Sequence, residues 1–136
     1  MIVLDTNVVS EPLKPAPSQA ELDWLDKQAP ETLYLTAASL AELLAGIEAL
    51  PKGRRRLELE QAMGRQILPL FEGRILPFDA KAAEAFGRVR TGAQAVGNTI
   101  GFADGAIAAI AAAQGFVLAT RNVRDFRGTG VELINS

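Results

Sequence analysis

Three acidic side chains stand where a carboxylate could take part in chemistry. Asp5 directly follows the apolar run "IVL", Glu42 lies near the start of an apolar helical stretch, and Asp104 lies in a run of Ala, Gly and Ile. Burying an isolated carboxylate costs free energy, so Asp104 needs a partner, a proton or a cation. Asp5 has a structural alternative, because an aspartate can cap the helix that follows it. Glu42 has another, because Ser39 and Glu42 have the spacing of a capping box.

A second group of polar residues follows the apolar run "FVL" near the end of the chain. Thr120, Asn122 and Asp125 come soon after this run. A solvated turn would have the same polar composition, so the group alone does not indicate a site. In a parallel sheet, however, the carboxyl ends of all strands lie at one edge. We therefore expect Asp5, Thr120 and Asn122 to share that edge.

The composition limits the chemistry that such an edge can perform. The 136 residues include no histidine and no cysteine, which removes the usual neutral-pH base and any thiolate metal site. Carboxylates gathered at one edge repel one another, and a pair about 4 Å apart costs about 4 kcal/mol at an effective dielectric constant near 20. A divalent cation relieves this repulsion, and oxygen ligands alone favour Mg²⁺ or Mn²⁺. Such a site suits hydrolysis of a phosphodiester.

Apolar runs that alternate with helical stretches must position these residues. Strands are predicted at residues 2–5, 32–37, 74–78, 116–120 and 131–135, and helices at residues 6–13, 18–28, 39–50, 54–68, 79–95 and 100–114. The predicted caps are the boxes Ser18–Glu21 and Ser39–Glu42, the N-cap Asp79 and the terminating Gly115. Strands that alternate with helices are typical of an α/β fold in which helices cover both faces of a small parallel sheet. At this length, residues 1–136 form one domain.

Net charge and exposed apolar residues indicate what the protein could bind and where it could be located. The net charge is −2, which does not indicate a general nucleic-acid binder, although Arg121, Arg124 and Arg127 recur every third residue. The first apolar run is too short for a signal peptide, and no membrane contact is predicted, so a cytoplasmic protein is expected. The helix at residues 40–50 is apolar on nearly every side, which predicts a homodimer.

Four segments resemble the motifs of PIN-domain nucleases, in the same order and at similar spacing: "IVLDTNVVSE", "LAELLAGI", "FADGAIAAIA" and "LATRNVRDF". The resemblance is greatest to VapC-type toxins of toxin–antitoxin modules, and within them to the FitB-like subgroup, which also has a segment similar to "ILPLFEGRILPFD". It implies a Rossmann-like fold and a Mg²⁺- or Mn²⁺-dependent ribonuclease. Such proteins are often dimers and are inhibited by a cognate antitoxin protein.

The resemblance also implies roles for individual residues. Asp5, Glu42 and Asp104 would be catalytic residues and metal ligands, and Asn7 and Thr120 would be supporting polar groups. Asn122 would belong to the catalytic set, but many members have a fourth acidic residue there. Asp125 lies one helical turn further on and would either replace that acid through a water molecule or cap the turn before Phe126.

These roles give a hypothesis for the mechanism. Asp5 and Asp104 hold the metal ion, while Glu42 completes the shell or orients the attacking water. Arg121 or Arg124 holds the flanking phosphates of single-stranded RNA.

Two other functions remain open at this stage. One is a haloacid-dehalogenase-type phosphotransferase with Asp5 as its nucleophile, although Asn7 stands where that class has a second aspartate. The other is a catalytically weak PIN-fold binding module, which Asn122 favours.

Overall fold

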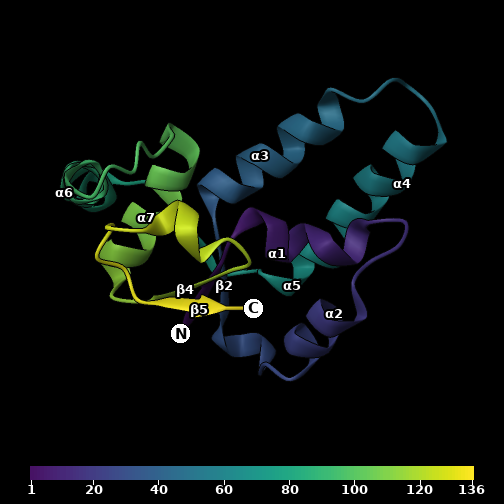
Figure 1. Cartoon of the computed structure of the whole chain (residues 1–136). Helices are drawn as coiled ribbons and strands as arrows, with labels where there is room; N and C mark the ends of the chain where they lie inside the picture. The colour runs from purple at the N-terminus through teal and green to yellow at the C-terminus, as the bar shows by residue number, and fades with distance from the viewer.

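The fold is built on a parallel sheet, as the alternation of strands and helices predicts (Figure 1). The computed structural model describes residues 1–136. Its five strands lie in the order β3-β2-β1-β4-β5. They are β1 (Ile2–Leu4), β2 (Leu33–Thr36), β3 (Ile75–Leu76), β4 (Val117–Thr120) and β5 (Leu133–Asn135). The strand order reverses between β1 and β4, and ligands of open α/β sheets bind at such a point, beside the carboxyl ends of the strands.

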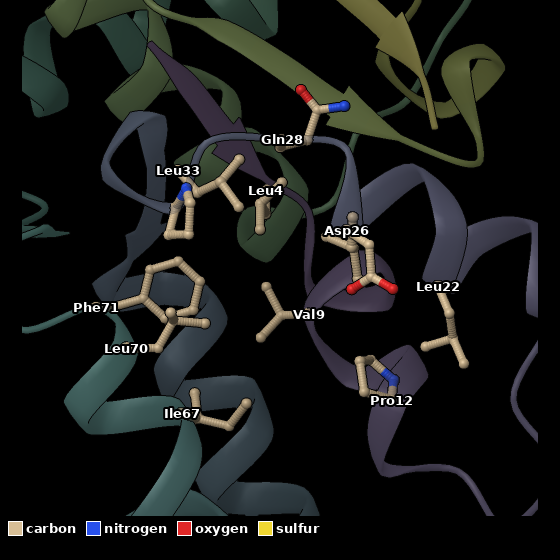
Figure 2. A pocket seen from close by; sticks show the side chains of 12 residues that line it. Leu4, Val9, Pro12, Leu22, Asp26, Gln28, Leu33, Ile67, Leu70 and Phe71 are labelled. Carbon is tan, nitrogen blue, oxygen red and sulfur yellow. The ribbon is translucent and has the colours of Figure 1, made fainter.

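Successive residues of the central strands point to opposite faces of the sheet, so each face has its own apolar core. Leu4 of β1 and Ala119 of β4 belong to the first core, with Val9 and Phe71 from the helices over that face. The helical elements on this side include α1 (Thr6–Ser10), the 3₁₀ turn η1 (Glu11–Leu13) and α2 (Gln19–Asp26). They leave a hollow of about 470 Å³, toward which Val9 and Phe71 point (Figure 2).

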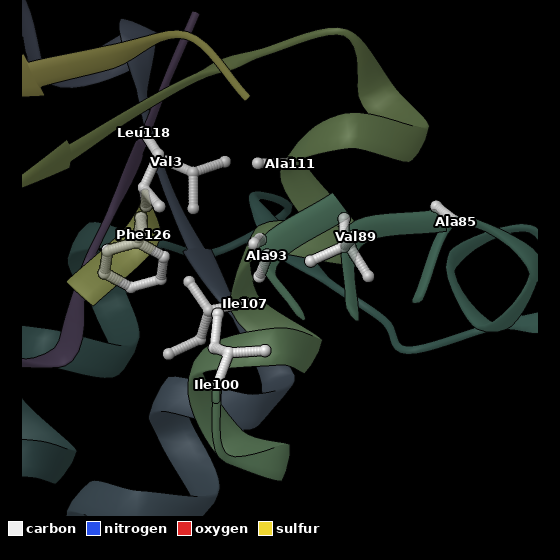
Figure 3. Close-up of a cluster of buried hydrophobic side chains, with 11 residues drawn as sticks. Val3, Ala85, Val89, Ala93, Ile100, Ile107, Ala111, Leu118 and Phe126 are labelled. Atoms are coloured by element: carbon white, nitrogen blue, oxygen red, sulfur yellow. The ribbon is translucent and has the colours of Figure 1, made fainter. Parts of the chain in front are cut away.

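The second core lies on the other face of the sheet. Val3 of β1 and Leu118 of β4 pack there against Ile107 and Val89 (Figure 3). These two residues come from α7 (Phe102–Gln114) and α6 (Ala80–Ala95), which pack against each other. With apolar side chains buried on both faces, the sheet is the middle of three layers.

The caps of three helices agree with the sequence only in part. Asp79 caps α6 as predicted, because its Oδ1 accepts a hydrogen bond from the Ala82 N–H at 3.0 Å. Gly115 ends α7 in the left-handed conformation, with φ 70°. The predicted box at Ser18 is wrong, since the Ser18 side chain makes no capping bond and its N–H donates to Glu11 Oε1 instead.

The second predicted capping box is also wrong. The helix α3 spans Ala37–Glu48 and begins directly after β2, with Thr36 as its N-cap. The Thr36 side chain accepts a hydrogen bond from the Ser39 N–H at 2.9 Å. Ser39 therefore lies inside the helix, and Glu42 lies beyond its first turn. The capping explanation for Glu42 does not hold, which leaves that carboxylate without a purely local structural role.

The helix predicted at residues 54–68 is interrupted. It consists of α4 (Arg54–Ala62), a π-helical turn η3 (Met63–Ile67) and the short α5 (Leu68–Leu70). Gly64 is a poor helix former, and Pro69 has no N–H and would clash with a carbonyl of the preceding turn in a regular α-helix. The wider π turn precedes Pro69, and it still buries Met63 and Ile67.

Two helices carry apolar residues that the chain itself does not cover. In Figure 1, α3 and α4 extend away from the sheet as an arm. Leu44 of α3 is 47% exposed and Leu57 of α4 is 55% exposed, while only Ser39 and Ile47 of α3 are buried.

No helix of the chain is both long and apolar enough to span a membrane. The two remaining 3₁₀ turns are η2 (Pro30–Thr32) and η4 (Val123–Phe126).

Candidate active site

Asp5 is at once a helix cap and the centre of a buried polar group. It lies at the carboxyl end of β1, is 5% exposed, and its Oδ1 accepts a hydrogen bond from the Thr6 N–H at 2.8 Å. Its Oδ2 accepts another from the Thr120 hydroxyl at 2.8 Å. Thr120, at the end of β4, in turn accepts the Asn122 N–H at 3.0 Å. Capping α1 therefore does not prevent Asp5 from belonging to a site, because Oδ1 caps the helix while Oδ2 accepts a hydrogen bond from Thr120 of β4.

Glu42 is connected to the same edge through the hydroxyl groups of Thr6 and Ser39, neither of which the sequence assigned to the site. The Thr6 hydroxyl lies 2.7 Å from Glu42 Oε1 and 2.9 Å from Ser39 Oγ. Because it has one hydrogen, it donates to one of them at a time. Ser39 lies three residues before Glu42 on α3, so both side chains share one helix face. That spacing was the signal that could have identified Ser39, and adjacency to Asp5 could have identified Thr6.

Asp104 lies in the first turn of α7 and has neither a hydrogen bond nor an ion pair for its carboxylate. Partial burial raises its pKa to about 6, and the negative charges of Asp5, Glu42 and Asp125 contribute to the same shift. Asp104 is therefore close enough to these three acids to feel their charge. Burial likewise raises the pKa of Asp5, the hydrogen bonds from Thr120 and Thr6 lower it, and the charges of Glu42 and Asp125 raise it further.

The donor set at this edge has the chemistry that a divalent cation requires. All the side-chain groups offered are oxygens, and no lysine or arginine lowers the pKa of Asp104. As placed, however, the acidic side chains form no group of three that could enclose an ion. Glu42 is exposed, and its Oε1 lies 2.7 Å from the Thr6 hydroxyl. The residues fit Mg²⁺ or Mn²⁺ in donor type and charge, with a side-chain adjustment needed to close the shell.

The other predicted site residues lie around this group with different degrees of contact. Asn7 is exposed, and its backbone carbonyl, rather than its side chain, accepts hydrogen bonds, from the Ser10 hydroxyl and from Arg121. The Asn122 side chain is exposed and makes no capping bond at η4. Asp125 lies within η4 rather than at its cap, and its N–H donates to the Asn122 carbonyl at 2.9 Å. Asp125 is thus the acid of this loop that acts on Asp5 and Asp104 through its charge.

The two arginines predicted to hold phosphates have unlike surroundings. Arg124 is exposed and forms no ion pair. The Arg121 Nη1 lies 3.3 Å from Glu11 Oε2 and 3.1 Å from Glu21 Oε2, so its charge is already matched inside the protein. Arg124 is therefore the better placed of the two to meet an incoming phosphate.

The largest hollow of the protein is not at this edge. Its lining is mostly apolar and includes Leu4, Leu22 and Leu33, with Asp26 as its one acidic residue (Figure 2). It lies over the first core, beside α2, whereas the carboxylates stand at the strand ends. A hollow of this composition could receive apolar side chains, but it offers nothing that resembles a hydrolytic site.

Comparison with known proteins identifies the family of the chain. The PIN domain model matches residues 2–131. The chain is 46% identical to VapC ribonuclease Y4jK of Sinorhizobium fredii, over 99% of this chain and 96% of that protein. It is 42% identical to Toxin FitB of Neisseria gonorrhoeae, over 99% and 97%.

Solved structures give the same result. The crystal structure of FitAcB from Neisseria gonorrhoeae superposes with a TM-score of 0.93 at 42% identity, covering 99% of this chain and 97% of that one. The structure of VapBC2 from Rickettsia felis, bound to a fragment of promoter DNA, gives a TM-score of 0.78 at 26% identity, with 98% of each chain covered.

Proposed function

This chain belongs to the PIN-domain family, alongside VapC and FitB toxins, and we propose on that premise that it is a Mg²⁺- or Mn²⁺-dependent endoribonuclease, the toxin of a type II toxin–antitoxin module. The observation that carries the proposal is that Asp104, which has no basic partner, lies close enough to Asp5 and Glu42 to feel their charges; burial first, and then these charges, raise its pKa to about 6. A bound cation would relieve the repulsion between these negative charges.

Each residue of the site then has a task. Asp5 and Asp104 would hold the ion, with the Asp5 carboxylate oriented by the Thr120 hydroxyl. When bound, the cation would lower the pKa of a water molecule and offset the charge of the phosphate. Glu42, which lies within hydrogen-bond distance of the Thr6 hydroxyl, would complete the ligand set or accept the proton of the attacking water. The water oxygen would bond to phosphorus as the bond from phosphorus to the 3′ oxygen breaks, and the 3′ oxygen would take up a proton from solvent, which leaves a 5′-phosphate and a 3′-hydroxyl.

The position of the site suits single-stranded RNA better than a duplex. The carboxylates are not in the large hollow but at the open edge of the sheet, where a flexible backbone can bring one phosphate to Asp104. Arg124 is an exposed cation in the turn η4, which follows β4 and also carries Asp125. Asn122 carries no charge where many family members have an acid, so this edge repels the phosphate less than theirs would.

A cleavage assay with Mn²⁺ tests the proposed function. We expect cleavage of a single-stranded RNA, abolished by a chelator and restored by excess Mn²⁺, with little cleavage of the same sequence in a duplex. RNA binding without cleavage at any Mn²⁺ concentration would favour the other candidate, a catalytically weak binding module, for which Asn122 is the specific observation. The family match removes the phosphotransferase alternative.

We propose an antitoxin protein as a second partner of the same edge. Solved relatives include FitAcB and VapBC complexes. A basic side chain of the antitoxin would take the place of the cation among Asp5, Glu42 and Asp104, and would inhibit the enzyme by charge as well as by obstruction.

A homodimer is the remaining proposal about assembly. Leu44 and Leu57 are exposed on the arm formed by α3 and α4, and burying such side chains in a partner copy removes apolar area from water. We expect the mass of a dimer by light scattering at high micromolar concentration, and of a monomer for Leu44→Glu. A wild-type protein that stays monomeric would contradict this.

A further inference from the structure

We propose that Arg121 is a positioning residue, which fastens the loop after β4 to α1 and α2 and so fixes the geometry of the acidic site. This rests on the proposed function, because it assigns Arg121 a role within that site. The Arg121 Nη1 lies 3.3 Å from Glu11 Oε2 and 3.1 Å from Glu21 Oε2. Its Nη2 donates to the Asn7 carbonyl at 3.5 Å. One side chain thus contacts three segments, at Asn7, Glu11 and Glu21, that lie at least 100 residues before it in the sequence.

The charges around Arg121 are balanced within the protein. Glu11 is 2% exposed and also pairs with Lys14 at 2.7 Å, while its Oε1 accepts the Ser18 N–H at 2.8 Å. Two carboxylates, Glu11 and Glu21, therefore face two cations, Lys14 and Arg121. A phosphate that approached Arg121 would compete with both carboxylates for the same guanidinium, and it would leave Glu11 buried with one cation fewer. This arrangement favours a fixed internal role over phosphate binding.

The backbone of Arg121 lies between two residues of the site. Thr120 donates to Asp5 Oδ2, and the Asn122 N–H donates to Thr120 Oγ1. Holding the Arg121 side chain therefore also holds the orientation of Thr120 and the start of the loop that carries Asp125. Residues that orient metal ligands in this indirect way typically account for about 10–100-fold in metal affinity or activity.

The same contact attaches α2 to the rest of the molecule. No residue of α2 is fully buried, although Trp24 and Leu25 of this helix pack, partly buried, against the first core. The Glu21 carboxylate, which was predicted to cap α2, reaches Arg121 instead. Removing either Glu21 or Arg121 releases this contact, and removing Arg121 also releases Glu11 and the Asn7 carbonyl. The shared contact distinguishes positioning from phosphate binding, to which Glu21 would be unfavourable.

The test compares Arg121→Gln, Glu21→Gln and the double variant, with Arg88→Gln as the matched control on the exposed face of α6. Mn²⁺ affinity is measured by calorimetry, and kcat and KM are measured on single-stranded RNA. We expect Arg121→Gln to bind Mn²⁺ about tenfold more weakly and to lose kcat, and Glu21→Gln to change in the same direction by a smaller factor, with KM changed by less than about twofold in both. The double variant should lose little more than Arg121→Gln, because the residues share one interaction. Arg88→Gln should match the wild type.

The opposite pattern would overturn the proposal. If Arg121 binds phosphate, Arg121→Gln raises KM at unchanged Mn²⁺ affinity, and Glu21→Gln binds RNA as well as the wild type or better. Arg121→Lys guards against simple unfolding, since it keeps the charge and should recover part of the Mn²⁺ affinity. A wild type that binds Mn²⁺ without cleaving RNA would reject the nuclease function, while the Mn²⁺ titrations would still decide the role of Arg121. A wild type that does not bind Mn²⁺ would reject both.

Discussion

Replacing Asp104 by asparagine should reduce RNA cleavage by at least about a hundredfold, which corresponds to about 2.7 kcal/mol of transition-state stabilisation. Asp104 accepts no hydrogen bond and forms no ion pair, so the substitution removes a metal-binding charge without breaking a contact of the fold. Initial rates of cleavage with saturating Mn²⁺ measure the loss, and circular dichroism confirms that the variant is folded.

Asp79→Asn is the matched control for this prediction. Asp79 caps α6, and asparagine caps a helix about as well as aspartate. It should leave cleavage unchanged, which shows that the effect at position 104 does not come from an Asp-to-Asn change as such. Cleavage by Asp104→Asn at the wild-type rate would remove Asp104 from the site.

Binding of Mn²⁺ should stabilise the folded protein by about 2.7 kcal/mol at a hundredfold excess over its dissociation constant. The physical reason is that the cation binds the gathered carboxylates of the native state and has no such site in the unfolded chain. For a domain of this size the melting temperature should rise by roughly 10 °C. Differential scanning calorimetry with and without metal measures the shift. Asp104→Asn should show little of it, and an equal shift in that variant would contradict the prediction.

Acid should reproduce part of this stabilisation in the metal-free protein. The pKa of Asp104 is raised from 3.8 to about 6 in the folded state, so the folded protein binds a proton that the unfolded chain does not. Its free energy of unfolding should therefore rise as the pH falls from 7 to 5, by at most about 1 kcal/mol, because solvent screens a half-buried carboxylate. Asp104→Asn should lose most of this dependence, and the part that remains comes from Asp5, whose pKa burial also raises.

Asp5→Asn should behave differently from Asp104→Asn, although both remove one repelling charge. Considered from the sequence alone, the loss of charge at Asp5 is expected to stabilise the metal-free protein. Both Asp5 oxygens, however, accept hydrogen bonds, from the Thr6 N–H and the Thr120 hydroxyl. An amide nitrogen in place of Oδ2 leaves the buried Thr120 hydroxyl without its acceptor, which costs about 1–3 kcal/mol. That cost offsets the relief of repulsion.

The sequence alone predicted the layers of the fold and limited the chemistry open to the site. The uninterrupted apolar run that contains Val3 and Leu4 predicts a strand buried on both faces, and Asp79 and Gly115 carry their capping roles in their residue types. The absence of histidine and cysteine confines any metal to oxygen ligands. These features are local, so they do not depend on where distant segments lie.

The tertiary structure decided which of several possible hydrogen-bond or ion-pair partners each polar group contacts. Thr36 and Ser39 can both cap a helix, and the end of β2, set by its register with β1 and β3, selects Thr36. That choice frees Ser39 and Glu42 to meet Thr6 across the sheet edge. Arg121 could face solvent or protein, and the return of the chain beside Glu11 and Glu21 pairs it inside. Hydrogen bonds and ion pairs act over a few ångströms, so a sequence fixes them only after the fold has placed both partners.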